Sequence, residues 1–129
     1  MSKDILIVDD DELMLWGLER FFSSIGMSVT TLCCGKDCLP HLEQNSYTFV
    51  FLDINIGDAD GLELLSEIKK KEFQSRVIIM TGEDTEINRE KAVRGGAYAF
   101  VKKPFELSEL SQLVKDSLGT DVGDACHEA

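Results

Sequence analysis

The feature that most constrains the fold of this chain is the alternation of five short apolar runs with segments of helical periodicity. The runs are rich in Ile, Val, Leu and Phe, and lie at residues 5–8, 27–32, 48–52, 77–80 and 98–101. The runs carry no charged residue and most are apolar at nearly every position, which is typical of a strand that is buried on both faces. Strands of this kind that alternate with helices predict an α/β domain with a parallel sheet covered on both sides.

Three of the intervening segments have a broad apolar helical face. Ile87 and Val93 mark a further, more polar helix, and Pro40, which is tolerated in a first helical turn, places the start of another helix near Asp37. The apolar faces consist of Leu13, Trp16, Leu18, Phe21, Phe22 and Ile25 in the first segment, of Leu62, Leu64, Leu65 and Ile68 in the third, and of Leu107, Leu110, Leu113 and Val114 in the last.

Length and composition predict one compact domain. The chain has 129 residues, of which 43% are hydrophobic, and this is an ordinary domain size. We expect the domain to span residues 1–118 and a short C-terminal tail to span residues 119–129. No apolar stretch approaches the ~18 residues of a membrane span, and residues 1–4 lead directly into the first run. We therefore expect a cytoplasmic protein with no membrane contact.

The charge of the chain is strongly acidic but uneven. A net charge of -11 argues against direct binding of nucleic acid, whose phosphates require Lys and Arg for neutralisation. Residues 69–103 nevertheless hold nine basic and five acidic side chains, and we call this segment the basic island. Within it, Arg89, Lys91 and Arg94 form either a solvated helix face or a docking surface.

The four cysteines show no framework spacing. Cys33, Cys34, Cys38 and Cys126 are interpreted as reduced thiols, because no secretory segment precedes them. Cys34 and Cys38 lie close in sequence to His41, and a metal cluster there is a less favoured alternative. Zinc sites usually combine two separated Cys/His pairs, and only one such group is present.

Polar residues follow four of the five apolar runs. In an open α/β sheet, ligands bind outside the carboxyl ends of the strands, so these positions are the candidate site. The second run ends instead in two cysteines, which fits a strand order of 2-1-3-4-5 with that strand at the sheet edge. The polar residues are Asp9 and Asp10 after the first run, Asp53 after the third, Thr81 after the fourth and Lys103 after the fifth.

Three carboxylates, one hydroxyl and one ammonium at a single edge indicate phosphoryl chemistry. Clustered carboxylates repel each other unless a cation compensates their charge. Mg²⁺ prefers oxygen ligands and usually takes one or two carboxylates together with a phosphate oxygen, as Asp9, Asp10 and Asp53 allow. Lys103 and Thr81 suit phosphoryl oxygens, and a carboxylate can act as the nucleophile of an aspartyl phosphate. The site is therefore interpreted as a phosphoryl acceptor.

Four segments around these residues resemble the receiver domain of bacterial two-component response regulators. They are ILIVDDDE at residues 5–12, FLDIN at residues 51–55, IMTG at residues 79–82 and VKKPF at residues 101–105. The resemblance covers about residues 4–118. It implies a flavodoxin-like, doubly wound (βα)5 fold with a parallel five-stranded sheet of order 2-1-3-4-5.

The resemblance also implies the roles of the site residues. Asp53 would accept a phosphoryl group from a histidine kinase or a phosphotransfer protein. Asp9 and Asp10 would hold Mg²⁺ together with Asp53 and the backbone carbonyl of Asn55. Lys103 would contact the phosphoryl group, and the peptide bond before Pro104 is expected to be cis.

A switch and an output surface follow from the same resemblance. Thr81 would move toward the phosphoryl group and Phe100 would turn inward behind it. The surface of the fourth helix, fifth strand and fifth helix would then change its affinity for a partner or for a second copy in a homodimer. Asn55 and Glu83 occupy positions that influence the lifetime of the phosphoryl group. Catalysis would be limited to the chain's own phosphorylation and dephosphorylation.

The sequence departs from the family pattern at two places. Gly57 stands four residues after the acceptor, where the family usually has proline, so the loop around it is expected to be more mobile. The acidic run from Asp9 to Glu12 is longer than a metal-binding pair requires. We expect Asp11 to begin the first helix, where the helix dipole favours a negative charge.

Two other classes of protein share parts of this pattern. An aspartate-based phosphatase of the haloacid dehalogenase type would need a second acid two residues after Asp53, and that position is Asn55. A flavodoxin-like flavin-binding protein would need a Ser/Thr/Gly-rich loop after the first run, where the acidic residues Asp9 to Glu12 would repel the flavin phosphate.

Overall fold

The computed structural model describes residues 3–118, which form a five-stranded parallel sheet flanked by helices. The strand order is β2-β1-β3-β4-β5, and every pairing is parallel, so the predicted fold class and strand order are confirmed. The predicted tail at residues 119–129 lies outside the described residues. The strands are β1 (Lys3–Val8), β2 (Val29–Leu32), β3 (Tyr47–Asp53), β4 (Arg76–Thr81) and β5 (Ala99–Lys102).

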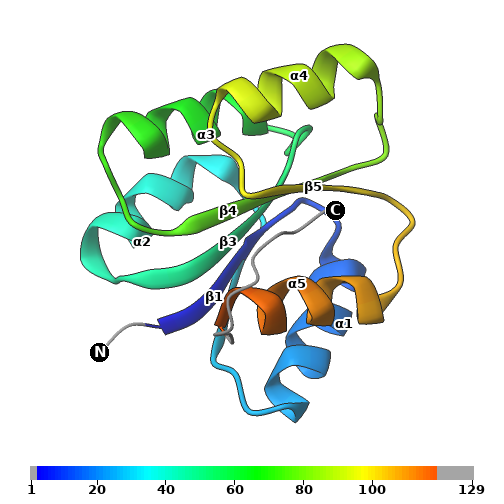
Figure 1. Cartoon of the computed structure of the whole chain (residues 1–129). Coiled ribbons are helices and arrows are strands. Elements are labelled where there is room, and N and C mark those ends of the chain that lie inside the picture. Colours follow the sequence, from blue (N-terminus) through cyan, green and yellow to red (C-terminus); the bar gives the residue numbers. More distant parts are fainter. Residues whose placement is uncertain (1–2, 119–129) are drawn as a thin grey trace.

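The helices lie in two layers, one on each face of the sheet (Figure 1). A short 3-10 turn (Gly35–Asp37) precedes α2, so this helix begins one residue after the expected Asp37. None of the helices within residues 3–118 has the length and apolar character needed to cross a membrane. One layer contains α1 (Glu12–Ser24) and α5 (Leu107–Leu118), and the other contains α2 (Cys38–Gln44), α3 (Gly61–Lys70) and α4 (Glu86–Arg94).

Alternate side chains of each strand supply the two cores. On β1, Ile5 and Ile7 point into the core under α1 and α5, whereas Leu6 and Val8 point into the core under α2, α3 and α4. All four side chains are fully buried. The continuous apolar runs of the sequence therefore reflect burial on both faces of the sheet.

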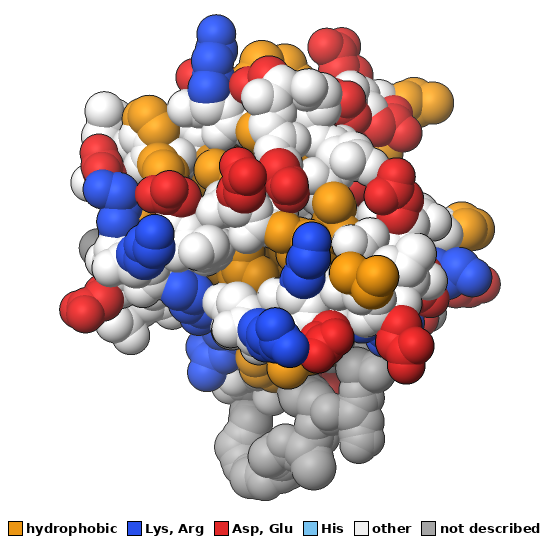
Figure 2. Space-filling model, turned by 90° about the horizontal axis from the view of Figure 1, so that it is seen from above, with side chains coloured by type: hydrophobic (Ala, Val, Ile, Leu, Met, Phe, Trp, Pro, Cys, Tyr) orange, Lys and Arg blue, Asp and Glu red, His pale blue; other side chains and the backbone are white. Residues whose placement is uncertain are grey.

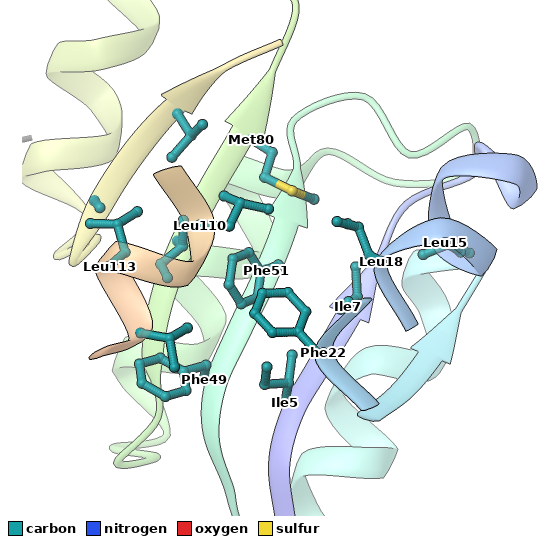
Figure 3. Packing of buried hydrophobic residues seen from close by; sticks show 14 residues of the cluster. Ile5, Ile7, Leu15, Leu18, Phe22, Phe49, Phe51, Met80, Leu110 and Leu113 are labelled. Carbon is teal, nitrogen blue, oxygen red and sulfur yellow. The ribbon is translucent and has the colours of Figure 1, made fainter. Parts of the chain in front are cut away.

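Aromatic rings fill the centre of the core under α1 and α5. Phe22 of α1 is fully buried and packs against Phe51 of β3, with ring centroids 5.8 Å apart, and Figure 3 shows both rings between the sheet and the helices. Leu110 and Leu113 of α5 complete this layer from the other side. This packing fixes the positions of β1 and β3, the two strands that end in the carboxylates of the candidate site.

The expected apolar face of α1 is only partly correct. In α1 the buried side chains are Leu15, Leu18 and Phe22, and the predicted core residues Leu13 and Trp16 are 77% and 59% exposed. The spacing of three and four residues in the buried set selects a narrower stripe than the one predicted.

The more polar helix that Ile87 and Val93 mark in the sequence is present as α4. Ile87 and Val93 do lie on this helix but are 65% and 72% exposed, and the buried side chain of α4 is Ala92. A small residue allows the helix to approach the sheet closely, and apolarity alone does not identify the face that makes this approach.

Side-chain caps begin three of the helices at the carboxyl edge of the sheet. Asp11 accepts a hydrogen bond from the backbone N–H of Met14, which confirms that this third acid of the acidic run caps α1. Asp60 and Thr85 cap α3 and α4 in the same way. The caps fix where the loops of the candidate site end.

We expect Phe22→Ala to destabilise the chain by about 3–5 kcal/mol, because it removes a fully buried ring from the centre of a core. Urea unfolding followed by circular dichroism measures the effect. The matched control is Leu13→Ala on the same helix, which should stay within about 0.5 kcal/mol because Leu13 is 77% exposed. Equal effects of the two substitutions would contradict the described orientation of α1.

Candidate functional site

The polar residues predicted from the sequence meet at the carboxyl edge of the sheet. Asp9 follows β1, Asp53 ends β3, Thr81 ends β4 and Lys103 follows β5. Asp9, Asp53 and Thr81 are buried, with 0%, 8% and 1% of their surface exposed. Because these strands are neighbours in the order β1-β3-β4-β5, segments that are far apart in sequence converge on one site.

The Lys103 ammonium bridges two of the buried carboxylates. Its Nζ atom donates to Asp9 Oδ2 at 2.8 Å and to Asp53 Oδ2 at 3.0 Å. The backbone N–H of Lys103 donates to the carbonyl of Thr81 at 2.8 Å, and the peptide bond to Pro104 is cis, as expected. The main chain of Lys103 is therefore held by β4, and its ammonium lies between the two carboxylates.

The pKa values of Asp53 and Lys103 are both raised in this site. Burial raises the pKa of Asp53, and the charge of Asp9 raises it further, whereas the hydrogen bond from Lys103 and the N–H of Asn55 oppose this shift without cancelling it. For Lys103, burial lowers the pKa, but the hydrogen bonds and charges of Asp9 and Asp53 outweigh this effect and the pKa is raised. The lysine is therefore a cation at neutral pH, and the Asp53 carboxylate is under-compensated.

Asp10 adds a third carboxylate to this pair. One oxygen from each of Asp9, Asp10 and Asp53 lies within 4.8 Å of the other two. Asp9 and Asp53 are buried and Asp10 is exposed, so the group faces outward on one side. A set of three carboxylate oxygens with access to water fits a hard divalent cation such as Mg²⁺, which keeps several of its waters.

The metal-cluster alternative at the cysteines has no support in the described part of the chain. Among residues 3–118, Asp9, Asp10 and Asp53 are the one group of acidic, Cys or His side chains arranged to hold a metal. Cys38 is fully buried, and burial raises the pKa of its thiol to about 12. A thiol in that state is a poor metal ligand, because thiolates are the binding form.

Gly57 has a backbone conformation that explains its departure from the family pattern. Its φ angle is +66°, which proline, with φ fixed near −65°, cannot adopt. A Cβ atom on Gly57 would lie 3.1 Å from Asp10 Oδ2. The loop after β3 therefore passes close to a candidate metal ligand, and glycine is the residue that fits this conformation without crowding Asp10.

Glu83 connects the loops that follow β3 and β4. Its carboxylate accepts a hydrogen bond from the side-chain amide of Asn55 at 2.8 Å, and its backbone N–H donates to Thr81 Oγ1 at 2.9 Å. Asn88 of α4 donates to the Glu83 carbonyl at 3.0 Å. The Thr81 hydroxyl is thus already bonded within its own loop.

Phe100 is half-buried on β5 and is covered by an arginine. The Arg89 guanidinium lies 4.7 Å from the ring centroid, and its Nε and Nη2 atoms donate to the Asp84 carboxylate at 2.5 and 3.2 Å. The pKa of Asp84 is lowered, first by this hydrogen bond and also by the charge of Arg89. One arginine therefore joins the loop after Thr81 to the ring of Phe100.

Asp58 and Asp84 make polar contacts that the sequence pattern does not mark, and Arg89 is in an ion pair instead of being merely solvated. Asp58 accepts hydrogen bonds from the backbone N–H groups of Gly35 and Lys36, at 2.8 and 3.1 Å. Neither acid lies at a strand end. Their partners are distant in sequence or lie on a polar helix, so no local pattern marks them.

A comparison with protein families places the chain in one of them. The response regulator receiver domain matches residues 5–115. The chain belongs to this family, whose members are receiver domains of two-component signal transduction systems.

Curated relatives and solved structures agree with this assignment. The chain is 33% identical to the transcriptional regulatory protein BasR of Escherichia coli over 86% of this chain and 50% of BasR, and 36% identical to the DNA-binding transcriptional regulator NtrC of Klebsiella pneumoniae over 84% of this chain and 23% of NtrC. It therefore spans half or less of the length of these relatives.

Two solved structures show the likeness of the fold. A CheY-like receiver domain protein of Methanospirillum hungatei superimposes with a TM-score of 0.85 at 27% identity, covering 91% of this chain and 94% of that one. The beryllofluoride-activated NtrC4 receiver domain dimer gives a TM-score of 0.82 at 27% identity, covering 88% of this chain and 94% of that one.

We expect Asp53→Asn to raise the stability of the chain at pH 7. Because the pKa of Asp53 is raised in the folded state, the folded chain keeps a proton that the unfolded chain releases near the ordinary value of 3.8. Stability therefore falls as the pH rises through this window, and at neutral pH the ionised carboxylate destabilises the fold. Asparagine removes that penalty, so the urea midpoint should rise at pH 7 and the gain should disappear below about pH 3.8.

Asp58→Asn is the control of opposite sign. The pKa of Asp58 is lowered, first by the hydrogen bond from the Gly35 N–H, so its ionised form stabilises the fold above the ordinary pKa. This substitution should lower the urea midpoint at pH 7, and the loss should vanish on acidification. A shift of the same sign in both variants would contradict the described electrostatics.

Arg89→Ala should release both of its contacts. We expect the pKa of Asp84 to rise toward its ordinary value and the folded state to lose little stability, since the ion pair is exposed to solvent. Carbon-detected NMR titration of the carboxyl groups measures the pKa. Arg94→Ala, which breaks an exposed pair with Glu90, should leave Asp84 and the Phe100 ring resonances unchanged. Unchanged Asp84 titration in the Arg89 variant would count against the contact.

Proposed function

We propose that Asp53 is the phosphoryl acceptor of a Mg²⁺-dependent signalling switch, and that its donor is the phosphohistidine of a histidine kinase or a phosphotransfer protein. The observation that carries this proposal is the Lys103 ammonium held between Asp9 and Asp53 at 2.8 and 3.0 Å, beside a third carboxylate. This arrangement pairs an under-compensated carboxylate with a fixed cation at the position where phosphoryl charge would develop.

The ligands of the cation follow from the acidic group. The carboxylates of Asp9, Asp10 and Asp53, with the backbone carbonyl of Asn55, would hold Mg²⁺. When bound, the cation neutralises the clustered negative charge and that of the incoming phosphoryl oxygens. Asp10 is exposed, so the site is open to a donor from the solvent side.

The chain's own residues carry the remaining steps. An Asp53 carboxylate oxygen forms the new O–P bond as the P–N bond to the donor histidine breaks, and the imidazole leaves with its electron pair. Asp53 Oδ1 is oriented by the N–H of Asn55 at 3.4 Å, and Oδ2 by Lys103. As Asp53 gives up its charge, the Lys103 ammonium keeps Asp9 and gains a phosphoryl oxygen as a partner.

Thr81 and Phe100 form the proposed switch. The Thr81 hydroxyl accepts from the N–H of Glu83 and has its own proton to donate to a phosphoryl oxygen. A movement of Thr81 toward that oxygen would pull on the N–H of Glu83 and displace the loop that contains Asp84. Arg89 joins Asp84 to the Phe100 ring, so the displacement reaches β5. Asn55 and Glu83, which are hydrogen-bonded to each other beside Asp53, are placed to control access of water to the phosphoryl group.

The output surface is proposed to lie on α4, β5 and α5. Ile87 and Val93 of α4 and Leu107 of α5 are exposed apolar side chains on these elements. Figure 2, which views the molecule from the side of α3 and α4, shows hydrophobic side chains between basic and acidic ones on that face. The surface would bind a partner or a second copy, and the activated NtrC4 receiver domain, a relative in fold, is described as a dimer.

We expect incubation with a small phosphodonor and Mg²⁺ to add the mass of one phosphoryl group to the full chain, as measured by intact-protein mass spectrometry. Asp53→Asn should abolish the adduct, and Asp60→Asn, which alters the N-cap of α3, should retain it. Lys103→Met should slow the reaction by about 10²-fold, the usual effect of losing one charge-stabilising donor, whereas Lys102→Met should not. An undiminished adduct in Asp53→Asn would refute the assignment, as would an adduct that forms equally in the presence of a chelator.

A further inference from the structure

Cys33 and Cys34 form a pair of adjacent thiols between β2 and the 3-10 turn. Cys33 is exposed and Cys34 is half-buried, and the two residues are neighbours in sequence. None of the proposed steps of phosphorylation uses these residues. Two neighbouring thiols in contact with solvent are a reactive group of their own, whereas Cys38, which is fully buried, is not.

The loop that begins with this pair is fastened to the loop after β3. Asp58 accepts hydrogen bonds from the backbone N–H groups of Gly35 and Lys36, and we call these two bonds the Asp58 clasp. Gly35 is buried so closely against Ala59 that a Cβ atom on it would lie 2.5 Å from the Ala59 side chain. The backbone directly after Cys34 therefore cannot move without disturbing the clasp.

The clasp lies one residue from Gly57, which is beside the candidate metal site. Gly57 precedes Asp58, and the position that its Cβ would take is 3.1 Å from Asp10 Oδ2. The same short loop is closed by a hydrogen bond from the Ile56 N–H to the Ala59 carbonyl. The hydrogen bonds of Asp58 and the adjoining backbone of Gly57 thus connect Gly35 to a position beside Asp10.

We propose that Cys33 and Cys34 are an oxidisable dithiol, which peroxides close to a disulfide, and that closure loosens the Asp58 clasp and slows phosphorylation of Asp53. The second part rests on the proposed function. The geometry supports the coupling because the Cys34 backbone is extended, with φ −130° and ψ 133°. A ring joining two adjacent side chains requires the backbone to turn there, next to the N–H groups that Asp58 holds.

The oxidation balances with hydrogen peroxide as the oxidant. The Cys33 sulfur attacks one peroxide oxygen, so that an S–O bond forms, the O–O bond breaks and one water leaves. The Cys34 sulfur then attacks the Cys33 sulfur, the S–S bond forms, the S–O bond breaks and a second water leaves. Two thiols have lost two electrons, and the peroxide has gained them.

The difference in exposure indicates which of the two sulfurs reacts with the peroxide first. Cys33 is exposed and meets the oxidant first. The pKa of Cys34 is raised, first by its hydrogen bond with Cys33 and further by burial and by the charges of Asp58 and Asp37, so Cys34 remains a thiol and acts second.

The product would be easily reversed. Adjacent Cα atoms are about 3.8 Å apart, which is shorter than the roughly 4.4–6.8 Å of ordinary disulfides, so the bond is strained and readily reduced. Strained, exposed disulfides have the oxidising potentials that suit a reversible regulatory bond. The site is therefore suited to a transient signal rather than to stabilising the fold.

The first experiment tests the dithiol itself. Full-chain protein with Cys126→Ser, a position outside the described residues, is treated with hydrogen peroxide and analysed by intact mass and peptide mapping. We expect the loss of two hydrogens and a bond between residues 33 and 34, with Cys38 still reduced. Cys33→Ser and Cys34→Ser should each abolish this product, and each should also abolish binding of phenylarsine oxide, which requires both sulfurs. Disulfide-linked dimers, or sulfinic acid without the internal bond, would overturn the proposal.

The second experiment tests the coupling. The oxidised protein should show displaced amide resonances for Gly35 and Lys36. Its phosphorylation should be at least about fivefold slower than that of the reduced protein, which is the lower end of typical coupling between two sites. Asp58→Asn should slow the reduced protein similarly, and Asp60→Asn, which alters only the α3 cap, should not. Equal rates in the oxidised and reduced forms would refute the coupling. Failure of the reduced protein to accept phosphate would refute the proposed function instead, and the amide shifts would still report on the clasp.

Discussion

The charge balance at Lys103 is the interaction on which the rest of the structure depends. Asp9 and Asp53 are buried at the ends of two adjacent strands, where an uncompensated charge would cost several kcal/mol. A single ammonium, that of Lys103 directly after β5, contacts both carboxylates. The sheet order matters because it brings these strand ends together, and the two hydrophobic layers matter because they fix each strand along its length. The balance is incomplete, and this leaves Asp53 with a raised pKa.

The loops around this charge cluster are held by polar contacts that differ in kind from the core. Glu83 contacts Thr81 and Asn55, Arg89 contacts Asp84 and Phe100, and Asp58 contacts the loop after β2. These contacts are exposed or partly exposed and individually weak, so each can be exchanged for another at small cost. A rigid sheet therefore supports a rim whose arrangement is easily altered, which is the combination that a switch requires.

The sequence predicted the sheet and its order well, because continuous apolar runs can only be buried on both faces and because polar residues at strand ends share one edge. It did not predict which apolar residues of a helix stay exposed. Trp16 and Val93 are apolar, as core residues usually are, but both are exposed. The orientation of each helix is set by the side chain that packs against the sheet, which is Phe22 in α1 and Ala92 in α4. It also missed the contacts of Asp58 and Arg89, since those depend on how loops distant in sequence meet.

The positive φ angle of Gly57 restricts the evolutionary paths open to this loop. A single exchange to the family's usual proline is incompatible with the turn that this chain makes, because the ring fixes φ on the opposite side of zero. Any L-residue with a side chain would also crowd the Asp10 carboxylate. Descendants of this sequence are therefore expected to keep glycine there, or to change positions 56–59 and the orientation of Asp10 together, so that the loop is inherited as one unit.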